Sequence, residues 1–288
     1  MANKNNGVLA PCKRLHWVTL SPVGSNKRRS SGRRTRMVKR AGIILTLMLC
    51  LANMALAESA TVAVASNFRA SAESLVTVFE QQTGHTVVIS AGSTGRLYAQ
   101  IVNGAPFDVL LAADAEHPRL LTESGGALPE SRFTYAVGQL VLWSADPTLD
   151  GDDCAQALQG LRFRRLAIAN PNIAPYGTAA REVLEHLQLW EALDGRLVMG
   201  GNIAQAMQFV SSGNADLGLV ARSLVGSASL PASTCQWKVP ETWHAPIEQQ
   251  AVQLRRGTDN KAAAAFLDFL RGDQARRMII SYGYTVPR

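Results

Sequence analysis

The segment Thr61-Val-Ala-Val-Ala-Ser-Asn-Phe68 decides the fold. Its first five residues form a short apolar run with β-branched side chains, which is typical of a buried strand. Ser66 and Asn67 then supply side chains that favour a helix start. Apolar residues at helical spacing continue from Phe68 to Phe79, and Gly84 is a suitable helix end. The segment therefore predicts a strand that turns directly into a helix.

The same strand-to-helix pattern recurs along the chain. Further strands are predicted over 86–90, 107–112, 135–144, 166–169, 196–199 and 216–220. Helices are predicted between these strands, with Asp114 capping a short one, and a late helix is predicted over 261–270. Alternation of this kind indicates the α/β class, built of units with parallel sheets.

The net charge of +7 suggests nucleic-acid binding until its distribution is considered. Eleven of the 29 Lys and Arg lie in residues 1–57, which contain no acidic residue. The remaining 18 are outnumbered by 22 Asp and Glu, so the body of the chain has a net charge of −4. We therefore expect no nucleic-acid partner.

Residues 1–57 are interpreted as a leader. Met37-Val-Lys-Arg40 is followed by an apolar stretch over 41–56 and by Ala55-Leu-Ala57, the three parts of a secretory signal peptide. We expect cleavage after Ala57 and a periplasmic location.

Several alternatives for the leader remain open. One is a membrane anchor, although the apolar stretch is shorter than the roughly 20 residues of a span. Cys50 suggests lipidation and Arg33-Arg34 suggests twin-arginine export, but both contexts fit poorly. Met37 is the expected true start, and a long basic region over 1–36 is the alternative.

Two cysteines remain after the leader. Cys154 and Cys235 form an even pair in an exported chain, which permits a disulfide, and we expect them to pair.

The sequence lacks the common catalytic motifs. It contains no nucleophile elbow, phosphate-binding loop or dinucleotide fingerprint. His85, His117, His186 and His244 show no zinc-binding spacing. We therefore expect a protein that is not an enzyme.

Four helix starts carry small or hydroxylated residues: Ser66-Asn67, Ser93-Thr94, Tyr176-Gly177 and Asn202-Ile203. Each start offers unpaired N–H groups and the positive end of a helix dipole, and side-chain hydroxyls add neutral donors. In α/β sheets such turns lie at the carboxyl ends of strands, where ligands bind. Each one alone is explained by ordinary helix capping, but the four together favour an anion site.

These turns lie within segments that resemble the periplasmic molybdate-binding proteins of ABC importers. The resemblance covers nearly the whole chain after about Thr61. The segments that carry it are Val64-Ala-Ser-Asn-Phe68, Thr83-Gly-His-Thr-Val-Val-Ile-Ser-Ala-Gly-Ser-Thr-Gly95, Ile101-Val-Asn-Gly-Ala-Pro-Phe-Asp108, Ala174-Pro-Tyr-Gly177 and Ala215-Asp-Leu-Gly-Leu-Val220.

The resemblance implies a bilobed type II periplasmic-binding-protein fold, with two Rossmann-like lobes and an anion cleft between them. The chain is expected to cross between lobes near Gly138 and near Glu248. The first lobe would then comprise residues 58–138 and 249–288, and the second would comprise residues 139–248.

The resemblance also implies the residues of the site. The positions that match are Ser66, Asn67, Ser93, Thr94, Tyr176 and Ile203. Some family members have a tyrosine where this chain has Ala221, so Tyr176 is expected to be the tyrosine that matters here. Arg96 is unusual for the pattern. We expect its side chain to point to solvent, and contact with the anion is the alternative.

The function implied by the resemblance is capture of molybdate or tungstate and delivery to the membrane permease of an ABC importer. Molybdenum would be held as its oxyanion, with no protein ligand on the metal and no cofactor. The protein is expected to act as a monomer. The alternatives are a binding protein for another oxyanion, such as sulfate or phosphate, and an enzyme on the same scaffold.

Overall fold

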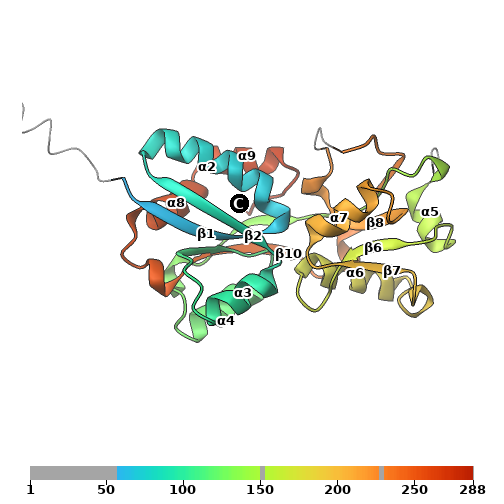
Figure 1. Cartoon of the computed structure of the whole chain (residues 1–288), viewed down its shortest axis with the longest axis horizontal. Coiled ribbons are helices and arrows are strands. Elements are labelled where there is room, and N and C mark those ends of the chain that lie inside the picture. The colour runs from blue at the N-terminus through green and yellow to red at the C-terminus, as the bar shows by residue number, and fades with distance from the viewer. Residues whose placement is uncertain (1–56, 150–152, 227–229, 288) are drawn as a thin grey trace, which may run out of the picture. The chain divides into compact units, whose positions relative to one another are not determined.

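The computed structural model describes residues 57–149, 153–226 and 230–287 (Figure 1). The described residues belong to one compact unit, residues 56–288. The predicted leader lies outside the described residues, except for Ala57. Every helix in the described ranges is too short or too polar to cross a bilayer.

The first sheet has five strands in the order β2-β1-β3-β10-β4. Strands β1, β2 and β3 are mutually parallel, whereas β10 runs antiparallel to both of its neighbours. The strands are β1 (Ser59–Ala65), β2 (Thr86–Gly92), β3 (Val109–Leu111), β4 (Phe133–Gly138) and β10 (Ile247–Gln253).

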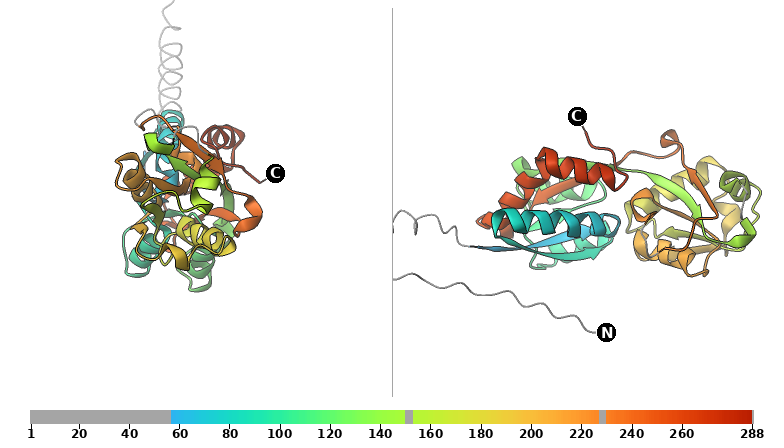
Figure 2. Two further views of the ribbon diagram at one scale, coloured as in Figure 1. Left: turned by 90° about the vertical axis from the view of Figure 1, so that its right-hand side faces the viewer. Right: turned by 90° about the horizontal axis from the view of Figure 1, so that it is seen from above.

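Helices cover both faces of this sheet (Figures 1 and 2). Helices α2 (Arg69–Thr83), α8 (Lys261–Arg271) and α9 (Asp273–Ser281) lie on one face, and α3 (Thr94–Val102) and α4 (Glu116–Glu123) lie on the other. Because side chains alternate along a strand, Val62 and Val64 of β1 enter the core beneath α2, whereas Ala63 enters the core beneath α3. We call this sheet with its helices the first lobe.

The second sheet also has five strands, in the order β7-β6-β8-β5-β9. Its parallel strands are β6 (Leu166–Ala169), β7 (Leu197–Gly200) and β8 (Leu217–Ala221), and its antiparallel strands are β5 (Leu140–Ser144) and β9 (Cys235–Lys238). With helices α5 (Cys154–Gln159), α6 (Pro175–His186) and α7 (Ile203–Ser211) it forms the second lobe. The core of this lobe is continuous with Ala65 and Ala113 of the first lobe, so the two lobes are in contact.

The structure corrects several predicted elements. The single strand predicted over 135–144 is two strands, and the break at Gln139 is where the chain leaves the first sheet for the second. Both halves are buried and extended, so the local pattern shows no boundary. Each sheet also contains antiparallel strands, whereas parallel sheets were predicted. The sequence did not indicate this because hydrophobic periodicity does not encode strand direction. Elements α5, β9, β10 and α9 were not predicted.

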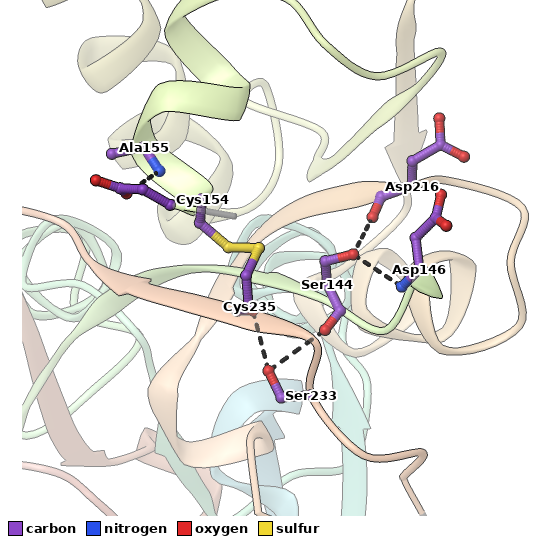
Figure 3. The surroundings of a disulfide bond; sticks show 8 residues. Ser144, Asp146, Cys154, Ala155, Asp216, Ser233 and Cys235 are labelled. Carbon is purple, nitrogen blue, oxygen red and sulfur yellow. Dashed lines mark hydrogen bonds between the residues drawn. A yellow bond between two sulfur atoms is a disulfide. The ribbon is translucent and has the colours of Figure 1, made fainter. Parts of the chain in front are cut away.

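A disulfide joins Cys154 and Cys235, which confirms the predicted pair (Figure 3). Cys154 is the first residue of α5 and Cys235 the first residue of β9, with Cα atoms 5.6 Å apart. The Asp153 carboxylate caps α5 by accepting from the N–H of Ala155 at 2.9 Å. The bond thus fastens a short helix to the edge strand of the second sheet.

Candidate functional site

All six residues predicted for the site line one small cavity. Four further small residues complete its wall, and its volume is about 10 Å³, room for roughly one water molecule. The lining residues are Ala65, Ser66, Asn67, Gly92, Ser93, Thr94 and Ala113 from the first lobe, and Ala174, Tyr176 and Ile203 from the second. The cavity is therefore enclosed by strand ends and helix starts of both lobes.

The first helix start differs from its predicted geometry. Ser66 and Asn67 do not cap α2, because they lie within a 3₁₀ turn, Ser66–Phe68, that precedes the helix. The amide Nδ2 of Asn67 instead donates to Gln249 Oε1 at 2.9 Å and to the Tyr284 hydroxyl at 3.0 Å. Asn67 is thus held firmly by the first lobe, through side chains distant in the sequence.

The second helix start presents two buried hydroxyls. Ser93 occupies the N-cap position of α3 without a capping hydrogen bond, and its Oγ has no partner among the described residues. Thr94 is fully buried, and its Oγ1 accepts the backbone N–H of Ala113 at 2.9 Å. A hydroxyl that accepts one hydrogen bond keeps its own proton for a ligand. Ser93 and Thr94 can therefore both donate to an anion.

Tyr176 is the second residue of α6, after Pro175 at the position where proline is best tolerated. Its hydroxyl accepts a hydrogen bond from Gln249 Nε2 at 3.2 Å. Burial raises the pKa of the Tyr176 hydroxyl well above its usual value, so the group stays protonated and neutral. Tyr176 therefore contributes a neutral donor from the second lobe.

Ile203 is the first residue of α7. Asn202 caps this helix, accepting the N–H of Gln205 at 3.0 Å through Oδ1. The first N–H groups of a helix have no partner within it, so the Ile203 amide is free of intrahelical bonding. Ile203 can contribute its backbone N–H, although its side chain is apolar.

Gly138 leaves the space that the Tyr176 hydroxyl needs. A Cβ at this position would overlap that hydroxyl and would lie 2.8 Å from Gln249 Nε2. Neither Gly138 nor Gln249 was predicted to belong to the site. Gly138 ends the first half of a continuous extended pattern, and Gln249 lies in a strand that the pattern did not reveal, so no local signal singled them out.

The site is electrostatically positive without charged side chains. None of the ten lining residues that the structure describes carries a charge. Helices α3, α6 and α7 begin at the cavity, as does the 3₁₀ turn Ser66–Phe68 that leads into α2. Each helix start is equivalent to roughly half a positive charge. Ala221 ends β8 within the core and does not belong to the lining.

Arg96 lies outside the cavity. Its side chain is exposed, as predicted, and the guanidinium lies beside Gly201, where a Cβ would be 3.2 Å from the nearest nitrogen. Gly201 precedes α7 of the second lobe, so Arg96 crosses from one lobe to the other at the surface.

Two hydrogen bonds also join the lobes beside the cavity. The N–H of Gly95 donates to the Ile173 carbonyl at 3.0 Å, and Ser223 Oγ donates to the Asn67 carbonyl at 3.1 Å. In the described parts of the chain, no three His, Cys, Asp or Glu side chains are grouped so that they could hold a metal ion. The donors around the cavity suit the oxygens of an anion.

Two α/β lobes that enclose a cavity of neutral donors define a solute-binding protein, and comparison with known proteins gives the family. Residues 60–285 match the family described as bacterial extracellular solute-binding protein, and the chain belongs to this family.

The names of individual relatives are more specific than the description of the family. The chain is 50% identical over 234 residues to the molybdate-binding protein ModA of Azotobacter vinelandii, covering 81% of this chain and 92% of that protein. It is 45% identical over 240 residues to ModA of Rhodobacter capsulatus, covering 83% and 93% of the two chains. The solved structure of the Azotobacter vinelandii periplasmic molybdate-binding protein matches with a TM-score of 0.74 and 43% identity, over 80% of this chain and all of that one. The predicted two-lobed fold and the family resemblance are thereby confirmed.

Proposed function

We propose that this chain binds molybdate between its lobes, at the cavity lined by the six predicted residues, and delivers it to an ABC importer. The cavity of about 10 Å³ has room for roughly one water molecule, so the lobes must move apart to admit the anion. One observation supports this most strongly. The six residues that the resemblance implies come from three helix starts and one 3₁₀ turn, and they line one cavity that lacks charged side chains in the structure described. The relatives that are 50% and 45% identical are named molybdate-binding proteins.

The chemistry of the cavity suits a dianion. Removing an anion from water is costly unless each oxygen meets donors in the protein. The proposed donors are three hydroxyls, the amide N–H of Ile203 and the backbone turn at Ser66 and Asn67. The hydroxyls are those of Ser93, Thr94 and Tyr176. The three helix starts and the 3₁₀ turn, at roughly half a charge each, offset about two negative charges. Molybdenum stays inside its oxyanion, so neither a protein ligand on the metal nor a cofactor is part of the proposal.

The lining also bears on the alternatives. A protonated phosphate needs an acceptor for its proton, and none of the ten lining residues described is Asp or Glu. A hydrolytic enzyme needs a base beside its nucleophile, and the same set contains no His, Lys or carboxylate. We therefore propose a binding role without catalysis. Discrimination between molybdate and sulfate would rest on the size of the cavity.

The cellular setting follows from the same proposal. The protein acts as a monomer in the periplasm after cleavage at Ala57 and docks on the permease subunits of the importer. The proposed lobes are residues 58–138 with 249–288, and residues 139–248. Strand β10 of the first sheet begins at Ile247, two residues before the proposed second boundary. N-terminal sequencing of the exported protein should begin at Glu58, and an intact leader would contradict this location.

The direct test is a calorimetric titration of residues 58–288 with molybdate, tungstate, sulfate and phosphate. Trp143, Trp190, Trp237 and Trp243 provide a second, fluorescence readout. We expect saturable binding of one molybdate or tungstate per chain and much weaker binding of sulfate and phosphate. Tighter binding of sulfate or phosphate would refute the proposed cargo.

A further inference from the structure

Gln249 lies behind the cavity and connects donors from both lobes. It is fully buried in β10 of the first lobe and is not one of the lining residues. Its Oε1 accepts from Asn67 Nδ2 at 2.9 Å and from the Tyr135 hydroxyl at 3.1 Å. Its Nε2 donates to the Tyr176 hydroxyl of the second lobe at 3.2 Å.

The direction of these hydrogen bonds is fixed from one end. The Tyr284 hydroxyl donates its single proton to the Asn67 carbonyl at 2.8 Å. Tyr284 can therefore only accept from the Asn67 side chain, which must present Nδ2 to it at 3.0 Å. That same Nδ2 group meets Gln249, so Gln249 must present Oε1 to Asn67 and Nε2 to Tyr176.

The last bond in this series determines what the Tyr176 hydroxyl can do. A phenol has one proton and can accept hydrogen bonds on its oxygen. Because Gln249 donates to this oxygen, the Tyr176 proton cannot point at Gln249. No described residue takes that proton in another hydrogen bond, and Tyr176 lines the cavity. The proton is therefore directed to a ligand.

We propose that Gln249 is a positioning residue of the anion site, whose amide holds the Tyr176 hydroxyl as a donor to the bound anion. This inference rests on the proposed function, because it concerns the same cavity and the same cargo. Gln249 does not touch the anion. Because Asn67 of the first lobe fixes the orientation of the Gln249 amide, Gln249 can only donate to the Tyr176 hydroxyl of the second lobe.

The test is a double-mutant cycle on the mature protein, with molybdate affinity measured by calorimetry. Gln249→Met keeps the length of the side chain but removes both hydrogen-bonding groups, and we expect about a tenfold loss of affinity. Tyr176→Phe should lose roughly ten- to a hundredfold, because it removes a donor to a charged oxygen. The double variant should bind no more weakly than Tyr176→Phe alone, because Gln249 acts through the hydroxyl that is already absent.

A matched control separates positioning from stability. Gln253 lies on the same strand, is buried, and donates through Nε2 to the Gly257 carbonyl at 2.7 Å within the first lobe. Gln253→Met should lower the melting temperature without changing molybdate affinity. Should Gln249→Met fail to fold, Gln249→Glu keeps the shape and still accepts from Asn67. Its carboxylate accepts the Tyr176 proton, so we expect affinity to fall at least tenfold.

The outcomes distinguish this inference from the proposed function. A parent protein that does not bind molybdate refutes both. A parent that binds, with Gln249 variants within twofold of it, refutes the positioning role alone. Losses that multiply in the double variant also refute it, because Gln249 would then act independently of Tyr176.

Discussion

Replacing Thr94 by valine removes one hydroxyl from the site while keeping the shape of the side chain. Thr94 is fully buried and its Oγ1 accepts from the Ala113 N–H at 2.9 Å, so two effects are expected. The lost donor to a charged oxygen should weaken molybdate binding by about 1.5–3 kcal/mol, a ten- to hundredfold rise in Kd. The Ala113 N–H left without its acceptor should lower the free energy of unfolding by about 1–3 kcal/mol.

Calorimetric titration with molybdate and thermal unfolding of the ligand-free protein measure these two effects separately. Thr94→Ser is the matched control, because it keeps the hydroxyl and loses one methyl group, worth about 1 kcal/mol of stability. It should retain most of the affinity. Parent-like affinity in Thr94→Val would refute the role of this hydroxyl. Equal losses of affinity in both variants would show that packing, and not hydrogen bonding, is what Thr94 contributes.

Three further predictions concern residues outside the cavity. Arg96→Ala should leave molybdate affinity within about twofold, since one exposed contact is worth little; abolished binding would contradict the neutral-donor site. Replacing Cys154 and Cys235 by serine should cost up to about 4 kcal/mol in denaturant unfolding without changing affinity, because the bond closes a long loop within the second lobe. Burial acts to raise the pKa of Asp216, but hydrogen bonds from the Arg164 side chain and from neighbouring backbone N–H groups hold it below the usual value. The contribution of the ionised Asp216 to folding stability is therefore present above about pH 4 and is lost as the pH falls through the lowered pKa. Asp216→Asn should lower the free energy of unfolding at pH 7 and change it little in acid. Urea unfolding at the two pH values measures this difference.

The proposed donors could be predicted from the sequence because each stands in a local pattern. Ser93, Thr94 and Ile203 lie in turns that connect a predicted strand to a predicted helix, so their place near a strand end could be inferred without tertiary information. Asn67 was found for the same reason, but its assigned role as a helix cap was wrong. Its amide is instead bonded to Gln249 and Tyr284, which are 182 and 217 residues away in the chain.

The sequence did not reveal the residues that orient those donors, and the reason is physical. Gln249 is a polar residue in a buried strand, and its hydrogen bonds exist only after β10 inserts between β3 and β4. Gly138 matters because of a side chain that approaches from the other lobe. Such positions are set by long-range packing, to which local periodicity is insensitive.

If the proposed donors bind the anion, their distribution between the lobes determines how the site works. Ser66, Asn67, Ser93 and Thr94 belong to the first lobe, and Tyr176 and Ile203 belong to the second. An anion on one lobe alone would lack part of the donor set and would keep water on its open side. Contact of the lobes completes the set and excludes that water, so binding and closure stabilise each other. Because the lining described is uncharged, reopening breaks hydrogen bonds to neutral groups and no salt bridge, which suits a cargo that must be released.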